Sequence, residues 1–278
     1  MNISQICVGN YPYAEFSFDF FVESMVRLNV HRIELWAAAP HFCIDDVNFN
    51  QVNQLKRKLA SSYISVACIT PEQYKYPINI ASTNADERRR SIAYFKKAVD
   101  IAQTLESPRL LIASGHHLRD ENHSEARKWL LDSLCEMAHG SCFKGVKVVF
   151  EAMFRDTDLI RTAAEMKQIL DEVDFYPGIN AMIDTDTSSR FHESPKDFLD
   201  LFGNDKFGYV HLNDGMPGGH LSVGDGCLPI SRYMDELEAA GYKGDIGTEI
   251  LADRYLKDPE QAIRNTLKIC SSMPAFRQ

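Results

Sequence analysis

Four polar residues that could take part in acid–base or metal chemistry lie at the ends of short apolar runs. Glu151 lies near the end of VKVVFEAMF, Asp184 in NAMIDTDT, His211 in GYVHLND and Glu249 in DIGTEIL. A charged group in such surroundings costs free energy unless a partner compensates it. Each of the four therefore has a structural partner or a chemical role, and a lone residue of this kind is more often a helix cap or an ion-pair partner.

The elements that must position these residues are short apolar runs typical of β-strands, which are separated by amphipathic segments. Helical spacing of apolar residues predicts helices at 17–29, 85–105, 123–138, 158–173 and 229–241, among others. Alternation of strands and helices predicts parallel pairing, and eight such units predict an α/β fold of the closed (β/α)8 barrel type, a single domain over residues 1–278. The predicted strands are Ile3–Val8, Arg32–Trp36, Ile64–Thr70, Arg109–Ala113, Val146–Ala152, Ile179–Asp184, Phe207–Asn213 and Asp245–Ile250.

Two dipeptides in the sequence support the predicted alternation of strands and helices. Ser194-Pro195 and Asp258-Pro259 each place a capping residue before a first-turn proline, which predicts helix starts at both places.

In a parallel barrel the C-terminal ends of the strands meet at one rim, where active sites form. Four consecutive predicted strands, the fifth to the eighth, thus deliver a carboxylate or an imidazole to the same rim.

Carboxylates crowded at one rim repel one another unless a cation lies among them. Three carboxylates and one imidazole form a mixed oxygen and nitrogen donor set, which suits Mn²⁺, Co²⁺, Mg²⁺ or Zn²⁺. We therefore expect a divalent metal ion at Glu151, Asp184, His211 and Glu249.

Composition and charge narrow the functional class. The 278 residues carry a net charge of −9, so binding to nucleic acid would need a local basic patch working against the overall field. The nearest candidate, Arg88–Arg90, is expected on the solvated face of a helix. No apolar run is long enough to span a membrane, and the N-terminus lacks the pattern of an export signal. We therefore expect neither a nucleic acid nor a membrane partner.

The seven cysteines are scattered and never form a CxxC pair. This pattern favours neither a disulfide framework nor a zinc knuckle, and it is typical of the reducing cytoplasm. We therefore expect a cytoplasmic protein.

The order Glu, Asp, His, Glu on successive strands, followed by Gly224-Asp225-Gly226 after the seventh, resembles the xylose isomerase-like TIM-barrel superfamily over the whole chain. Three segments look more specifically like those of fructoselysine 3-epimerases, which are relatives of D-tagatose 3-epimerases. They are IELWAAAPHF (Ile33–Phe42), ITPEQYKYPIN (Ile69–Asn79) and LIASGH (Leu111–His116).

The resemblance implies one divalent metal ion per chain, with Mn²⁺ favoured and Co²⁺, Mg²⁺, Ni²⁺ or Zn²⁺ as alternatives, bound by the four rim residues. It also implies epimerisation at carbon 3 of a ketose or ketosamine, with Glu151 and Glu249 as catalytic acid and base on opposite faces of the sugar. Inverting such a carbon needs one group to remove a proton and another to return one, and a cation lowers the free energy of the enediolate between these steps. A homodimer or homotetramer is implied as well.

Further positions match polar sites of the epimerase pattern and are expected to contact the sugar substrate. For Glu34 a structural ion pair is an equally good interpretation, and Trp36 and Tyr74 could form an apolar wall against a sugar face. The expected substrate contacts are Glu34, His41, Glu72, His116 and His220.

The chain also departs from the family pattern. Thr187 stands where many members carry a histidine, HLNDGMPGGH contains no arginine after His211, and the acidic residue that usually follows Glu151 is displaced to Asp156 or Asp158. These departures bear on the identity of the substrate more than on the metal site.

Alternative functions are an aldose–ketose isomerase, a lyase resembling inosose dehydratase, a non-catalytic sugar-binding barrel and an endonuclease IV-like repair nuclease. The nuclease would need three metal ions and more histidines.

Overall fold

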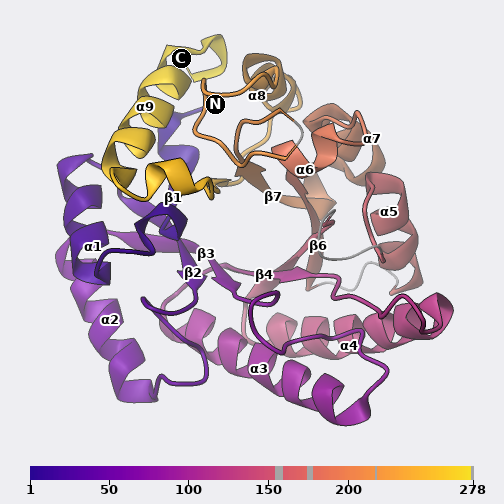
Figure 1. Cartoon of the computed structure of the whole chain (residues 1–278). Coiled ribbons are helices and arrows are strands. Elements are labelled where there is room, and N and C mark those ends of the chain that lie inside the picture. The colour runs from indigo at the N-terminus through magenta and orange to yellow at the C-terminus, as the bar shows by residue number, and fades with distance from the viewer. Residues whose placement is uncertain (154–158, 174–177, 217, 277–278) are drawn as a thin grey trace.

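The computed structural model describes residues 1–153, 159–173, 178–216 and 218–276, which form a closed barrel of parallel strands surrounded by helices (Figure 1). Within these ranges the strands are neighbours in chain order, and β8 pairs with β1 to close the barrel. The predicted (β/α)8 fold is confirmed. The strands are β1 Ile6–Gly9, β2 Arg32–Ala37, β3 Ser65–Pro71, β4 Arg109–Ala113, β5 Lys147–Glu151, β6 Ile179–Asp184, β7 Phe207–Leu212 and β8 Ile246–Thr248.

The strands are buried along nearly their whole length because the helices cover the outside of the barrel and side chains fill the inside. All six residues of β6 are buried, for example. The last strand is shorter than the predicted Asp245–Ile250, since the chain leaves the ladder after Thr248. Glu249 then directs its backbone N–H to the carbonyl of Leu212 at 3.3 Å, which keeps the residue beside the end of β7.

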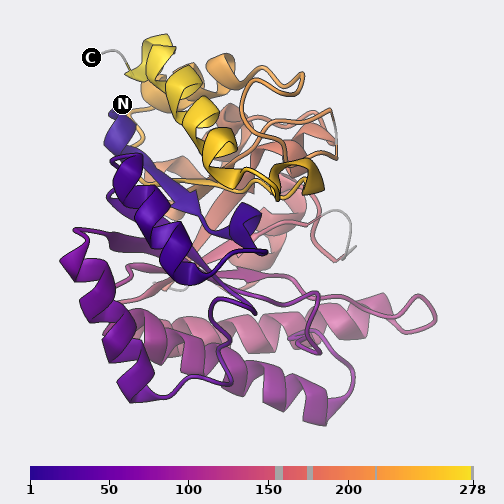
Figure 2. The same cartoon turned by 60° about the vertical axis from the view of Figure 1, so that its left-hand side comes forward.

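Helices wrap the barrel on all sides, and Figures 1 and 2 both show α3 and α4 side by side on its outside. The predicted starts at Ser194-Pro195 and Asp258-Pro259 are confirmed, because α7 begins at Pro195 and α9 at Pro259. Their bounds are α1 Phe18–Arg27, α2 Phe49–Ser61, α3 Ala85–Thr104, α4 His123–Phe143, α5 Ala163–Glu172, α6 Thr185–Ser189, α7 Pro195–Lys206, α8 Ile230–Ala239 and α9 Pro259–Ser272, with short 3-10 turns at Ile3–Gln5, Tyr11–Tyr13, Asp253–Tyr255 and Pro274–Phe276.

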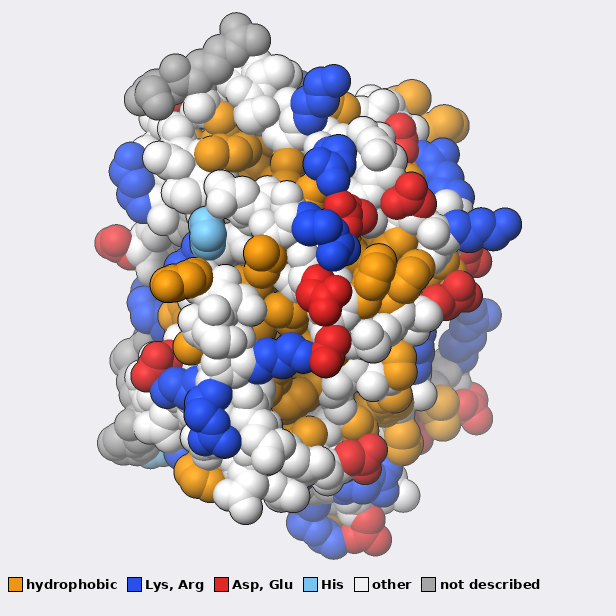
Figure 3. Space-filling view, turned by 90° about the vertical axis from the view of Figure 1, so that its left-hand side faces the viewer, with side chains coloured by type: hydrophobic (Ala, Val, Ile, Leu, Met, Phe, Trp, Pro, Cys, Tyr) orange, Lys and Arg blue, Asp and Glu red, His pale blue; other side chains and the backbone are white. Residues whose placement is uncertain are grey.

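Charged side chains of both signs are mixed on the surface. On the face that carries α1, α2 and α9, Lys and Arg lie among Asp and Glu (Figure 3), with ion pairs such as Arg27–Glu260 at 2.8 Å. The run Arg88–Arg90 lies on α3, where Arg89 pairs with Asp86 and the Arg88 guanidinium lies 3.7 Å from the centre of the Trp129 ring. Arg89 and Arg90 are exposed, so the run lies on a solvated helix face, as expected, and its arginines have partners there. Within the described ranges, no helix combines the length and the apolar character needed to cross a bilayer.

Candidate active site

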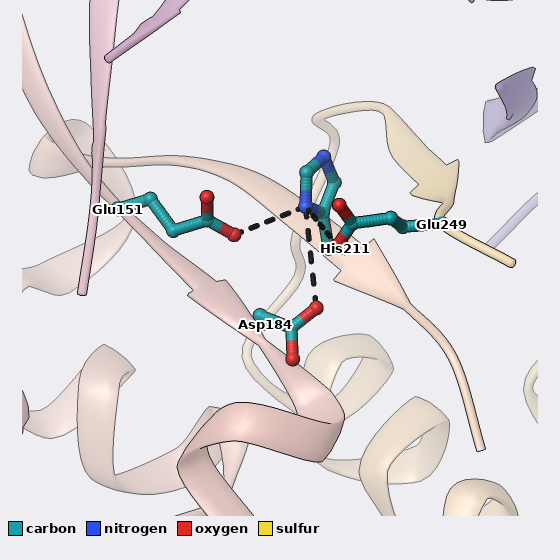
Figure 4. Close-up of side chains that lie close together, drawn as sticks. All are labelled: Glu151, Asp184, His211 and Glu249. Carbon is teal, nitrogen blue, oxygen red and sulfur yellow. Dashed lines mark hydrogen bonds and ion pairs between the residues drawn. The ribbon is translucent and has the colours of Figure 1, made fainter. Parts of the chain in front are cut away.

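The four predicted rim residues do converge. Glu151 and Asp184 are the last residues of β5 and β6, His211 lies in β7 one residue before its end, and Glu249 follows β8 directly. One donor atom from each lies within 4.8 Å of the donor atoms of the other three. Figure 4 shows the three carboxylates gathered around the His211 ring, with Glu151 and Glu249 approaching from opposite sides.

The convergence point is Nδ1 of His211. This atom lies 3.1 Å from Oε1 of Glu151, 3.1 Å from Oε2 of Glu249 and 4.0 Å from Oδ2 of Asp184. His211 is fully buried, and the three carboxylates are buried or nearly so. Such a set of oxygen and nitrogen donors, held together away from bulk water, fits a divalent cation.

Electrostatics make positive charge at this point favourable. Burial raises the pKa of Glu151 to about 7, and burial also raises the pKa of Asp184. Burial alone would lower the pKa of His211, but Glu34, Glu249 and Glu151 outweigh it and raise this pKa well above its usual value. Positive charge beside the carboxylates, from either a protonated His211 or a bound cation, therefore stabilises the cluster.

Asp184 is held in place by two hydrogen bonds. Its Oδ1 accepts the backbone N–H of Thr187 at 2.6 Å and so caps α6, while its Oδ2 accepts the side-chain amide of Asn213 at 2.6 Å. Asn213 is itself bound to Thr185. Two neighbouring strand ends thereby fix the direction of this carboxylate before any ligand arrives.

His220 joins the cluster from the loop after β7. Its Nε2 lies 3.4 Å from Oε2 of Glu249 and 3.6 Å from Oδ2 of Asp184, and its Nδ1 lies 3.2 Å from Oδ2 of Asp186. Asp186 is fully buried and also accepts the backbone N–H groups of Gly218 at 2.8 Å and Gly219 at 2.9 Å. One carboxylate thus anchors both the loop and the imidazole. No spacing in the sequence singled out Asp186.

A cavity of about 460 Å³ opens above the cluster. Its walls include Glu151 and Glu249 together with Tyr11, Trp36, Glu72 and His220. The rings of Tyr11 and Trp36 are stacked with centres 5.5 Å apart, and Trp36 donates its indole N–H to Glu72 at 3.1 Å. An apolar wall with a few oriented polar groups is typical of small-molecule sites.

Of the five expected substrate contacts, only Glu72 and His220 are among the residues that line this cavity. His41 lies outside this lining, with its ring between the Asn10 side chain at 2.8 Å and the Phe16 carbonyl at 2.9 Å, and its contact with the substrate stays a prediction. His116 also lies outside the lining, at a backbone position fixed by Asn79.

Glu34 lies outside the lining as well. Its side chain is fully buried below the cavity, and it pairs with Nε2 of His211 at 2.9 Å. The ion pair of the alternative interpretation is thus present, and a substrate contact of Glu34 stays a prediction. Asp156 and Asp158, named as substitutes for the displaced acidic residue, lie outside the described residues.

Known proteins resemble this chain both in sequence and in structure. The chain is 25% identical over 247 residues to a fructoselysine 3-epimerase of Shigella flexneri, covering 87% of this chain and 88% of the relative. A D-psicose 3-epimerase from Clostridium cellulolyticum H10, solved with D-tagatose, shares the fold with a TM-score of 0.80 at 17% identity, over 96% of this chain and 97% of that one.

A third structure, the IolI protein solved with a zinc atom, matches with a TM-score of 0.77 at 14% identity, over 96% of this chain and 97% of that one. At these identities the structural matches establish the fold. The sequence model of the family described as xylose isomerase-like TIM barrel matches residues 22–273, which is most of the chain. This protein therefore belongs to the xylose isomerase-like TIM-barrel family.

Proposed function

We propose that this protein is a divalent-metal-dependent sugar epimerase that acts at carbon 3 of a ketose or ketosamine. The observation that carries the proposal is the placement of Glu151 and Glu249, which approach one buried cluster from opposite sides and both line the same cavity (Figure 4). The fructoselysine 3-epimerase relative supports the reaction class and adds ketosamines to the candidate substrates.

Two carboxylates placed in this way can invert a carbon next to a ketone. One of them, ionised, removes the proton from carbon 3, and the electron pair of the broken C–H bond spreads toward the neighbouring carbonyl. The other, protonated, returns a proton to the opposite face of the same carbon, so the only product is the epimer. Exchange with water restores the two protonation states for the next turnover.

In this proposal Glu151, Asp184, His211 and Glu249 hold one metal ion per chain, with Mn²⁺ favoured and Co²⁺, Mg²⁺, Ni²⁺ or Zn²⁺ as alternatives. When bound, the cation supplies positive charge against the negative charge that the substrate oxygens acquire. The fit rests on the donor types and on their mutual approach within 4.8 Å.

Glu72 and His220 are the proposed substrate contacts. The Glu72 oxygens accept N–H groups of Trp36 at 3.1 Å, Tyr74 at 2.8 Å and Lys75 at 2.9 Å, which fixes the carboxylate and leaves lone-pair capacity for a sugar hydroxyl. His220 places an imidazole beside Asp184. Thr187 stands where many family members carry a histidine, and in this chain His220 brings an imidazole to Asp184 from the loop after β7.

Deuterium incorporation tests the reaction. We expect the metal-reconstituted protein in D₂O to place deuterium at carbon 3 of at least one sugar in a panel of ketoses, ketose phosphates and fructosamines, as located by NMR. A product with the carbonyl moved to carbon 1 would identify an isomerase instead, and loss of water would identify a lyase. If the metal-loaded protein exchanges no carbon-bound hydrogen across the panel, the epimerase proposal is wrong.

Metal counting tests the nuclease alternative. The proposed site predicts about one ion per chain by elemental analysis, whereas an endonuclease IV-like site would hold three. The mixed surface charge on the α1, α2 and α9 face and the partnered arginines of α3 give no support to nucleic acid binding.

A further inference from the structure

Glu34 lies directly behind the proposed metal site, on the far side of His211 from the other carboxylates. It is the third residue of β2, and its Oε1 and Oε2 lie 2.9 and 3.1 Å from Nε2 of His211. The opposite ring nitrogen, Nδ1, faces Glu151, Glu249 and Asp184. The two nitrogens of one imidazole therefore face two different carboxylate environments.

Hydroxyl groups complete the surroundings of the Glu34 carboxylate. It accepts hydrogen bonds from the hydroxyls of Tyr11 at 2.6 Å, Thr70 at 2.5 Å and Tyr209 at 2.8 Å. Together with the N–H of His211 these are four donors, which matches the four lone-pair sites of an ionised carboxylate. A fully satisfied buried carboxylate is rigid and can orient the group that it faces.

The neighbouring strand leaves room for this arrangement. Gly247 of β8 pairs with His211 of β7, and a Cβ atom at position 247 would lie 2.2 Å from Oε2 of Glu34 and 2.4 Å from the Tyr209 hydroxyl. Any larger residue would displace the carboxylate or the tyrosine. A glycine at this point in the barrel wall is thus a requirement of the Glu34 position.

We propose that Glu34 is a positioning residue for the metal ligand His211. By accepting the N–H at Nε2, it fixes the tautomer and the ring orientation that turn the lone pair of Nδ1 toward Glu151, Asp184 and Glu249. Glu34 acts through His211 and touches no substrate, since it lies outside the cavity lining. The inference rests on the metal site of the proposed function and is independent of which sugar reacts.

Metal affinity is the first readout. A carboxylate behind a ligating histidine contributes about 10- to 100-fold to metal affinity. We expect Glu34→Gln, in the full chain freed of metal, to bind Mn²⁺ about 10- to 100-fold more weakly than wild type in calorimetric titration. Glu72→Gln is a matched control, because Glu72 is also a buried glutamate of the same barrel but contacts no metal-ligand side chain. It should keep the wild-type Mn²⁺ affinity.

The tautomer of His211 is the second readout. In the Zn²⁺-loaded, ¹⁵N-histidine-labelled protein, NMR should show the ring proton of His211 on Nε2 and the metal on Nδ1. If Glu34→Gln does not fold, Tyr209→Phe serves as the second variant, because it removes one donor from the carboxylate and keeps the charge. It should weaken Mn²⁺ binding by a smaller, measurable factor.

The outcomes separate this inference from the proposed function. If wild type binds none of Mn²⁺, Co²⁺, Mg²⁺, Ni²⁺ and Zn²⁺, the metal site itself is wrong. If wild type binds Mn²⁺ and the Glu34→Gln affinity stays within twofold of it, the role of Glu34 is overturned while the metal site stands. If Glu34→Gln fails to fold, a Tyr209→Phe variant with the same Mn²⁺ affinity as wild type overturns the role of Glu34 equally. A proton on Nδ1 of His211 in the metal-loaded wild type also contradicts the proposal.

Discussion

At the residue scale, the two proposed catalytic carboxylates have different surroundings. Glu151 is buried, and the pKa rise to about 7 reflects that burial. Burial would raise the pKa of Glu249 too, but His211 and His220 outweigh it and hold this pKa well below its usual value. Glu249 therefore interacts with two imidazoles, whereas Glu151 interacts with one.

Replacing Glu249 tests its role in proton transfer. Glu249→Gln keeps the shape of the side chain but cannot exchange a proton, so we expect turnover to fall by about 10²- to 10⁴-fold. Sugar binding should largely persist, as measured by calorimetry with the substrate found in the deuterium panel. Asp200→Asn on α7, an exposed residue paired with Lys196, is the control and should retain activity. Unchanged turnover in Glu249→Gln would remove Glu249 from the mechanism.

At the scale of elements, Glu260 connects the first and last helices of the barrel. Located on α9, it accepts hydrogen bonds from Ser24 at 2.9 Å and from the Arg27 guanidinium at 2.8 Å, both on α1. Partial burial would raise the pKa of Glu260, but the hydrogen bonds from Arg27 and Ser24 outweigh it and hold this pKa below its usual value. The ionised form of Glu260 is therefore more stable in the folded protein than in the unfolded chain.

This shift predicts a pH dependence of stability. Because the pKa is lowered by folding, the stabilisation is fully present above the unfolded value of about 4.3 and is lost as pH falls through the folded value. Glu260→Gln should thus lower the free energy of unfolding at pH 7, and its difference from wild type should shrink below about pH 4 in urea titrations. Asp171→Asn, from an exposed pair within α5, is the control with little expected effect. A difference that stays constant from pH 3 to pH 7 would contradict this account.

At the scale of the whole molecule, the proposed metal site joins four neighbouring strands, β5 to β8, at one rim. A cation that binds only the folded chain stabilises it by about 2.7 kcal/mol at 100 times its Kd. For a domain of 278 residues we expect Mn²⁺ to raise the Tm by roughly 5 °C in calorimetry, with a chelator reversing the rise. Asp184→Asn should lose most of this increase, and an equal rise in that variant would argue for binding elsewhere.

The homodimer or homotetramer and the cytoplasmic location stay predictions. Light scattering of the purified chain tests the first, and cell fractionation tests the second.

Much of the site was predictable because strand ends are easy to locate. Apolar runs alternating with amphipathic segments fix which end of each strand reaches the rim, so Glu151, Asp184, His211 and Glu249 could be placed together before the fold was known. The direction in which a loop side chain points follows no periodic pattern in the sequence. The ring of His41 therefore turns toward Asn10 and the Phe16 backbone, which the sequence pattern does not indicate.

The barrel, the rim and the four donor residues could be predicted from the sequence alone, because hydrophobic periodicity and residue type are local properties of the chain. The tertiary structure settled the burial of Glu34, since its partners Tyr209 and His211 lie 175 and 177 positions away along the chain. It also decided that Asp186 would hold His220, across 34 positions of sequence. Such contacts depend on how distant segments pack, and packing is a property of the folded chain as a whole.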